Sequence, residues 1–227
     1  MNTLVLAAAE APMQISVGGG SSAVKLFLLM TALSFATAAL VAVTSFTRII
    51  IVLGFLRQAL GTQQLPPNQV IVALALALTG FVMAPTFSTV QDEALGPYMR
   101  DEISGEVAFA KGSGPIREFL LKQTRPDDLR LFYELSKSQR PTRAEEVPLN
   151  IAVPAFMVSE LTTAFKMGLF IFIPLLLIDL LVSAVLMSLG MMMVPPTLVS
   201  LPLKIGVFLL ADGWHLMVMS LARSFQT

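Results

Sequence analysis

Apolar residues dominate both ends of this chain, and a polar segment separates them. One apolar stretch runs from Lys25 to about Ser45, an uncharged stretch extends from Val70 to Val90, and Met167 to Met187 carries a single charge. Uncharged stretches of about 20 residues suit helices that cross a bilayer core of about 30 Å. The pattern therefore predicts an all-α, membrane-associated fold.

Two places in the apolar halves share one spacing: a glycine, four residues, two prolines, two residues and a valine. Glycine favours a helix end, and a proline pair favours a corner before the next helix. Each place is therefore predicted to be the turn of a helical hairpin, whether the match reflects an internal duplication or similar turn chemistry. The two sets are Gly61, Pro66, Pro67 and Val70, and Gly190, Pro195, Pro196 and Val199.

The middle of the chain reads as a small water-facing region, because residues 91–150 hold most of the charge. Eleven acidic and nine basic residues lie between Asp92 and Glu146. Breaks are expected at Gly96-Pro97 and at Gly112–Pro115, and short amphipathic helices at Ile116–Thr124 and Pro126–Ser138.

Four parts follow from these patterns. They are a flexible N-terminal segment (1–22), a first apolar hairpin (23–90), a polar helical region (91–150) and a second apolar hairpin with a Met-rich loop (151–227). Residues 1–11 lack the basic start of a signal peptide. Pro85 is expected to kink or end its helix, Pro174 to kink the next, and the last segment, 198–221, to break at Pro202, Lys204 and Asp212.

Some charges lie in or beside the apolar segments of the second half. A charge that faces lipid costs about 2.5–3.5 kcal/mol on insertion scales. Such groups are predicted to pair within a chain or between the chains of an oligomer; an ion pathway and snorkelling to the interface are the alternatives. The residues are Glu160, Lys166, Asp179, Lys204 and Asp212.

In the first half, Arg48 and Arg57 are the only charges between Lys25 and Asp92. Basic residues favour the cytoplasmic side of a membrane protein. Both arginines are therefore assigned to the first hairpin turn, which is predicted to face the cytoplasm, with residues 91–150 outside.

Composition excludes several classes of function. Fifteen basic and fifteen acidic residues give no net charge, which does not suit a nucleic-acid binder. Cysteine is absent and His215 is the only histidine, so thiol chemistry and most metal sites are excluded. No nucleophile motif or HExxH is present. We expect no enzymatic activity, no cofactor and no bound metal. Trp214 is interpreted as an interfacial residue with polar neighbours, among them His215.

The second turn has an unusual composition, since Met191, Met192 and Met193 are consecutive and no charge lies between Asp179 and Lys204. Turns that face water are normally polar. Methionine side chains are unbranched and adapt to irregular surfaces. The triplet is interpreted as a soft apolar constriction or contact surface, with packing near a helix end as the alternative.

Several segments of the chain together form an extended signature. They are Ser45–Leu53, Phe55–Gly61, Pro66–Val70, Phe81–Pro85, Val153–Phe156, Ser159–Leu161, Gly190–Met193 with Pro195-Pro196, Leu201–Lys204 and Asp212–Trp214. These segments resemble the signature of the FliP family of flagellar protein export components, which includes a related injectisome component. The resemblance covers roughly residues 24–222, and the segment Leu56–Gln64 favours the flagellar branch.

The resemblance implies a subunit of the type III protein export gate in the bacterial inner membrane, within the flagellar basal body. Members assemble as a pentamer with FliQ and FliR, meet FlhB and FlhA, and conduct unfolded proteins, with much of their mass raised toward the periplasm. The family's Met-rich loop, a gasket around substrate, corresponds to Met191, Met192 and Met193. Members often begin with a cleavable signal sequence, of which this chain shows no clear example. An ion-coupled transporter that uses Glu160, Asp179 and Lys204 is the alternative.

Overall fold

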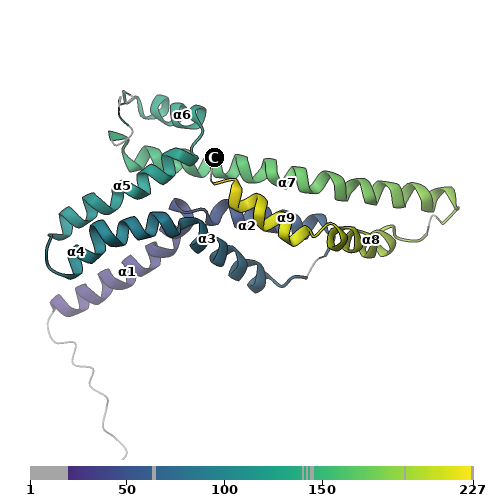
Figure 1. The fold of residues 1–227 in the computed structure, drawn as a ribbon, viewed down its shortest axis with the longest axis horizontal. Helices are drawn as coiled ribbons and strands as arrows, with labels where there is room; N and C mark the ends of the chain where they lie inside the picture. The colour runs from purple at the N-terminus through teal and green to yellow at the C-terminus, as the bar shows by residue number, and fades with distance from the viewer. Residues whose placement is uncertain are drawn as a thin grey trace, which may run out of the picture. The chain divides into compact units, whose positions relative to one another are not determined.

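The computed structural model describes residues 20–62, 65–139, 141, 143, 146–191 and 193–225. Within these ranges every long regular element is a helix (Figure 1), which confirms the all-α prediction. The elements are α1 (Gly20–Val43), α2 (Phe46–Ala59), α3 (Asn68–Val90), the π-helical turn η1 (Gln91–Leu95), α4 (Gly96–Met99), α5 (Gly105–Gln123), α6 (Pro126–Ser136), α7 (Leu149–Ser188), α8 (Thr197–Leu210) and α9 (Gly213–Arg223).

Among the described residues, three helical segments are long and apolar enough to cross a membrane: Leu26–Val43, Asn68–Met99 and Leu149–Ser188. The pair α8 and α9 would make a fourth if it acted as one span, although it bends by 64°. Helices with this much exposed apolar surface suit a membrane-associated protein.

The chain divides into two compact units, residues 1–39 and 40–227. The first unit contains most of α1, an apolar helix with exposed side chains such as Phe27 and Phe35. Residues 1–19 of the predicted N-terminal segment lie outside the described residues, and Gly20 to Ser22 belong to α1.

In the second unit, α2 lies beside the middle of α7 and packs against α3 as well (Figure 1). Ile49, Val52, Leu53 and Leu56 on α2 are almost completely buried. Removing such a side chain from water stabilises the fold by about 1.5–3 kcal/mol. Their core also includes Ile71 and Ala75 of α3, Ala164 and Leu175 of α7, and Met217 and Leu221 of α9.

A second core joins the polar segment to the first part of α7. Leu120 of α5 and Tyr133 of α6 are buried with Ala152 and Phe156 of α7. Side chains spaced three or four residues apart share one face of a helix, which explains how α6 buries Leu129 and Tyr133 together. The predicted helix at 126–138 is confirmed, with Asp127 and Asp128 in its first turn.

Several expected helix breaks are wrong. The helix α5 runs through Gly112–Pro115, and α4 begins at Gly96 directly after η1. Pro85 does not end α3, and Pro202 and Lys204 do not interrupt α8. Tertiary packing overrides local propensity here: Gly112 lies against Ala94, where a longer side chain would not fit.

The glycines of the two glycine–proline spacings share a backbone conformation, whereas the second prolines differ, with ψ 151° at Pro67 and −28° at Pro196. Gly61 has φ +77° and Gly190 has φ +76°, a left-handed conformation that glycine adopts without strain at a helix end. The next helix begins directly after each proline pair, at Asn68 and at Thr197. The spacing therefore specifies a helix end, a connection and a helix start in both halves.

Candidate functional site

Arg48 and Glu160 form a buried ion pair that joins α2 to α7. Their side chains are 3% and 0% exposed. Arg48 Nε donates to Glu160 Oε2 over 2.9 Å, and Nη2 donates to Glu160 Oε1. This bidentate geometry is the strongest arrangement between a guanidinium and a carboxylate.

The other donors of Arg48 reach two more segments. Nη1 donates to the carbonyl oxygen and the hydroxyl oxygen of Ser224, over 2.7 and 3.0 Å. Nη2 also donates to Gln123 Oε1 of α5 over 3.2 Å. All five N–H groups of the guanidinium therefore have acceptors, and one side chain ties α2, α5, α7 and the end of α9 together.

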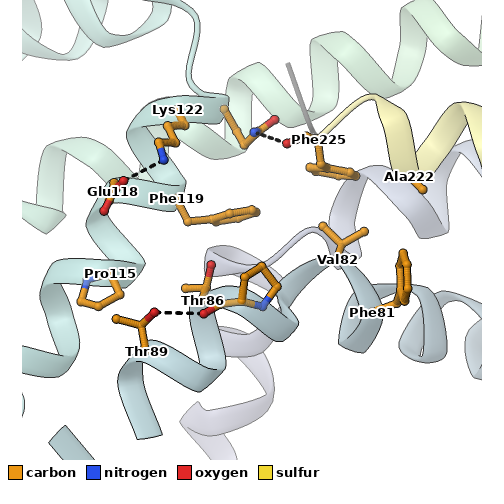
Figure 2. Close-up of a pocket in the computed structure, with 12 residues that line it drawn as sticks. Phe81, Val82, Thr86, Thr89, Pro115, Glu118, Phe119, Lys122, Ala222 and Phe225 are labelled. Carbon is orange, nitrogen blue, oxygen red and sulfur yellow. Dashed lines mark hydrogen bonds and ion pairs between the residues drawn. The ribbon is translucent and has the colours of Figure 1, made fainter. Parts of the chain in front are cut away.

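Aromatic rings close this network on one side. The guanidinium carbon of Arg48 lies 3.9 Å from the ring centroid of Phe225, which stacks with Phe119. Gln123 Nε2 donates to the Phe225 carbonyl oxygen over 3.1 Å. Figure 2 shows both rings beside a cleft of about 430 Å³ that α3 borders with Val82 and Thr86.

A second polar link lies on the next face of α7. Ser159 Oγ donates to Asp128 Oδ2 over 2.6 Å and accepts from the Arg125 backbone N–H over 2.9 Å. Asp128 and Ser159 are both buried. Adjacent residues of α7, Ser159 and Glu160, thus fix α6 and α2 respectively.

The assignment of Arg48 to the hairpin turn is wrong. Arg48 is the third residue of α2, far from the turn at the other end of that helix, and it is buried rather than exposed to water. A charged group with a complete set of partners can be retained inside a protein. The position of Arg48 therefore does not indicate which side of the membrane the first hairpin turn faces. Arg57 does lie in the last turn of α2, where a basic side chain suits the helix dipole.

Lys204 of α8 holds the other end of α2. Its Nζ donates to Asp179 Oδ2 of α7 and, over 3.0 Å, to the carbonyl oxygen of Ala59. The last carbonyl groups of a helix lack partners within the helix and carry partial negative charge. Lys204 therefore caps α2 while it pairs with Asp179, and it connects both hairpins.

The Met-bearing turn lies between α7 and α8, preceded by Gly190 and followed by Pro195 and Pro196. Met193 is 97% exposed and Met191 is 45% exposed. Met192 lies outside the described residues. No atom of the described residues lies within 4 Å of a Cβ added at Gly190.

Two of the five predicted charges, Lys166 and Asp212, are exposed on this chain, and neither pairs with Glu160, Asp179 or Lys204. The structure brings together Asp179 with Lys204, and Glu160 with Arg48. No group of three His, Cys, Asp or Glu side chains suited to a metal ion occurs in the residues that the structure describes.

Sequence reasoning missed the partners of Arg48 and Lys204 that are uncharged. Gln123, Ser224 and the Ala59 carbonyl group lie 75 to 176 residues away from the charge that they contact, and the Phe225 ring belongs to the residue after Ser224. The sequence carries no signal for these partners, because neither an uncharged side chain nor a backbone carbonyl group marks itself by residue type or spacing.

Known proteins extend these observations. The chain matches the FliP family over residues 29–221. It is 54% identical to "Flagellar biosynthetic protein FliP" of Bacillus subtilis over 205 residues, which are 90% of this chain and 93% of that protein. It is 53% identical over 210 residues to the protein of the same name from Pectobacterium carotovorum, covering 91% and 81%.

A third relative with that name, from Aquifex aeolicus, is 47% identical over 219 residues, 95% of this chain and 92% of the relative. The residues that match the family include α2, α3, α7 and α8. They therefore include both hairpin turns and the ion pairs Arg48–Glu160 and Asp179–Lys204. By this extent of similarity, the chain belongs to the FliP family.

Proposed function

We propose that this chain is a non-enzymatic subunit of the flagellar protein export gate, which conducts unfolded proteins across the bacterial inner membrane. The names of its relatives support a part in flagellar biosynthesis. Several copies, five by the family resemblance, surround a central path together with homologues of FliQ and FliR, next to homologues of FlhB and FlhA. Much of the mass lies toward the periplasm, and lipid covers the remaining apolar surface.

One observation supports this proposal most strongly: the Met-bearing turn is free of the chain's own core. Met191 and Met193 are exposed at the end of a hairpin whose base is fixed by the Asp179–Lys204 pair. Copies of this turn around an axis would place flexible thioethers in the path, where they repack around different side chains at low cost. The turn would act as a gasket that excludes ions but admits an unfolded chain.

An ion-coupled transporter is less well supported. Such a protein needs charged groups that exchange partners during transport. Glu160 has a bidentate partner in Arg48, and Lys204 is shared between Asp179 and a helix end. These contacts favour a structural role for the charges, which fix α2 against α7 and α8.

The gasket is tested by replacing Met191, Met192 and Met193 together with alanine in cells that carry the complete export apparatus. We expect a leak of small ions through the gate, with the subunit still present in the complex. Met187→Ala, an exposed methionine on α7 one turn before Gly190, is the control and should not leak. Unchanged leakage together with unchanged export of flagellar proteins would refute the gasket.

A further inference from the structure

Two opposite charges in the second apolar half have no ion-pair partner among the described residues of this chain. Lys166 of α7 and Asp212, the residue before α9, are both exposed. Neither forms an ion pair among the residues that the structure describes. Asp212 precedes α9 at a position where aspartate often caps a helix, yet its side chain makes no capping hydrogen bond. Both charged groups are therefore available for contacts outside the chain.

Each of these two charges is next in sequence to residues that line one apolar groove. A cavity of about 510 Å³ lies between α7 and the α8–α9 bend, and apolar side chains such as Met167, Phe170 and Met217 line it. Lys166 comes directly before Met167, and it lies one helical turn from Phe170 on the same face. Asp212 lies between Ala211 and Gly213, which both line the groove. The lysine thus flanks the α7 wall, and the aspartate flanks the opposite wall.

We propose that Lys166 of one copy pairs with Asp212 of the neighbouring copy across this groove. The inference rests on the oligomer of the proposed function and assigns one of its contacts. A charge beside apolar helices is costly when it faces lipid, so each group gains from an opposite charge that another chain supplies. Because the two groups are on different walls, a head-to-tail contact can repeat from copy to copy, and such contacts form a ring where the rotation between copies closes.

Stoichiometry favours a second copy of this chain over another kind of partner. Each chain carries one unpaired lysine and one unpaired aspartate beside the groove, so a closed ring of identical copies neutralises every one of them. A partner that carries only one of the two charges would leave the other exposed beside apolar surface.

Disulfide trapping tests the contact directly, because the chain contains no cysteine. Copies with Lys166→Cys and copies with Asp212→Cys, carrying different affinity tags, are expressed together in the full apparatus and oxidised. We expect a disulfide-linked dimer that carries both tags. The control replaces Lys166→Cys with Leu180→Cys, an exposed position about 21 Å further along α7, and should give no dimer.

Failure of this experiment separates the two proposals. A complex of normal mass without the mixed dimer would overturn the Lys166–Asp212 contact and leave the oligomer intact. A native chain that forms no oligomer with its partners present would overturn both.

Charge reversal gives an independent readout. Lys166→Asp or Asp212→Lys alone should reduce the assembled fraction at least tenfold, because each places like charges across the groove. A chain that carries both Lys166→Asp and Asp212→Lys should recover assembly to within about twofold of the native level, since every contact between copies is again between opposite charges. Two single variants that assemble normally would contradict the proposal, as would a double variant that assembles no better than the single variants.

Discussion

Two turns in this chain share a spacing and begin with a glycine at positive φ, but their surroundings differ. The first, residues 60–67, follows α2, which side-chain contacts hold at both ends. Near the start of α2, Arg48 donates hydrogen bonds to Glu160 and Ser224, and at its end Lys204 donates to the Ala59 carbonyl oxygen. The second, residues 189–196, carries an almost fully exposed Met193. We call them the anchored turn and the open turn.

The difference shows how one local pattern can serve two purposes. Glycine and proline specify the path of the backbone, whereas distant side chains decide whether a turn is fixed or free. In the anchored turn the distant side chain is Lys204, and its Nζ lies 3.9 Å from the position of a Cβ added at Gly61. No atom plays that role near Gly190.

The largest expected effect comes from Glu160→Gln, which leaves Arg48 buried without a countercharge. Removing one member of a buried ion pair costs about 3–5 kcal/mol. We expect a loss of that order in the free energy of unfolding of the detergent-solubilised protein, measured by chemical denaturation. Met193→Ala in the open turn is the control and should change it by less than about 0.5 kcal/mol. Equal stability of both variants would remove the distinction between the two turns.

The next effect tests the packing of α2 on α7. A Cβ at Gly168 would lie 2.5 Å from the Phe55 ring, and the Phe55 Cβ is only 3.1 Å away, so the ring has little freedom to retreat. Gly168→Ala should therefore lower the free energy of unfolding by about 1–3 kcal/mol.

Gly206→Ala on α8 is the matched control, because no atom lies within 4 Å of its added Cβ. Alanine favours a helix interior over glycine by up to about 1 kcal/mol, so this variant should be neutral or slightly more stable. A Gly168 variant as stable as the Gly206 variant would show that α2 and α7 are not in close contact.

A smaller effect separates the two turns themselves. Gly61→Ala and Gly190→Ala should each cost about 1 kcal/mol, because alanine is strained at these positive φ angles. Gly61→Leu should cost more than Gly190→Leu, since Leu201 and Lys204 already lie within 4 Å of Gly61. Thermal unfolding of the four variants measures both comparisons, and equal losses for the two leucine variants would contradict the anchoring of the first turn.

The smallest expected effect lies outside both hairpins. Arg100 Nε donates a hydrogen bond to Glu102 Oε1 over 2.6 Å. This bond lowers the pKa of the exposed Glu102 carboxyl group. Because the folded-state pKa is depressed, any stabilisation is present above the unfolded pKa of about 4.3 and is lost as the pH falls through the folded pKa. Glu102→Gln should leave stability at neutral pH nearly unchanged and slightly flatten its decrease in acid. A large loss at pH 7 would contradict the view that exposed pairs contribute little here.

The regular parts of the fold were predictable from local sequence. The apolar stretches, the helix at residues 126–138 and both glycine–proline connections follow from periodicity and turn chemistry. Helix ends were less predictable, because Pro85, Pro115 and Pro202 all lie inside helices that tertiary contacts hold together.

The charged sites were predictable only in part. Buried charges must find partners, so Glu160 and Lys204 could be selected from their apolar surroundings. Their partners could not, because Arg48 precedes Glu160 by 112 residues and the Ala59 carbonyl group has no sequence signature. The exposure of Met193 likewise depends on which side chains surround the open turn.

The central claim is that the open turn meets the exported protein. The most direct measurement uses Met193→Cys as the only cysteine of this chain, together with an export substrate that carries one cysteine and is stalled in the gate. We predict a disulfide between the substrate and position 193 in actively exporting cells. Leu210→Cys is the control, because it is nearly as exposed, at 91%, but lies at the other end of α8. Cross-linking at position 210 and not at position 193, with export intact, would contradict the account.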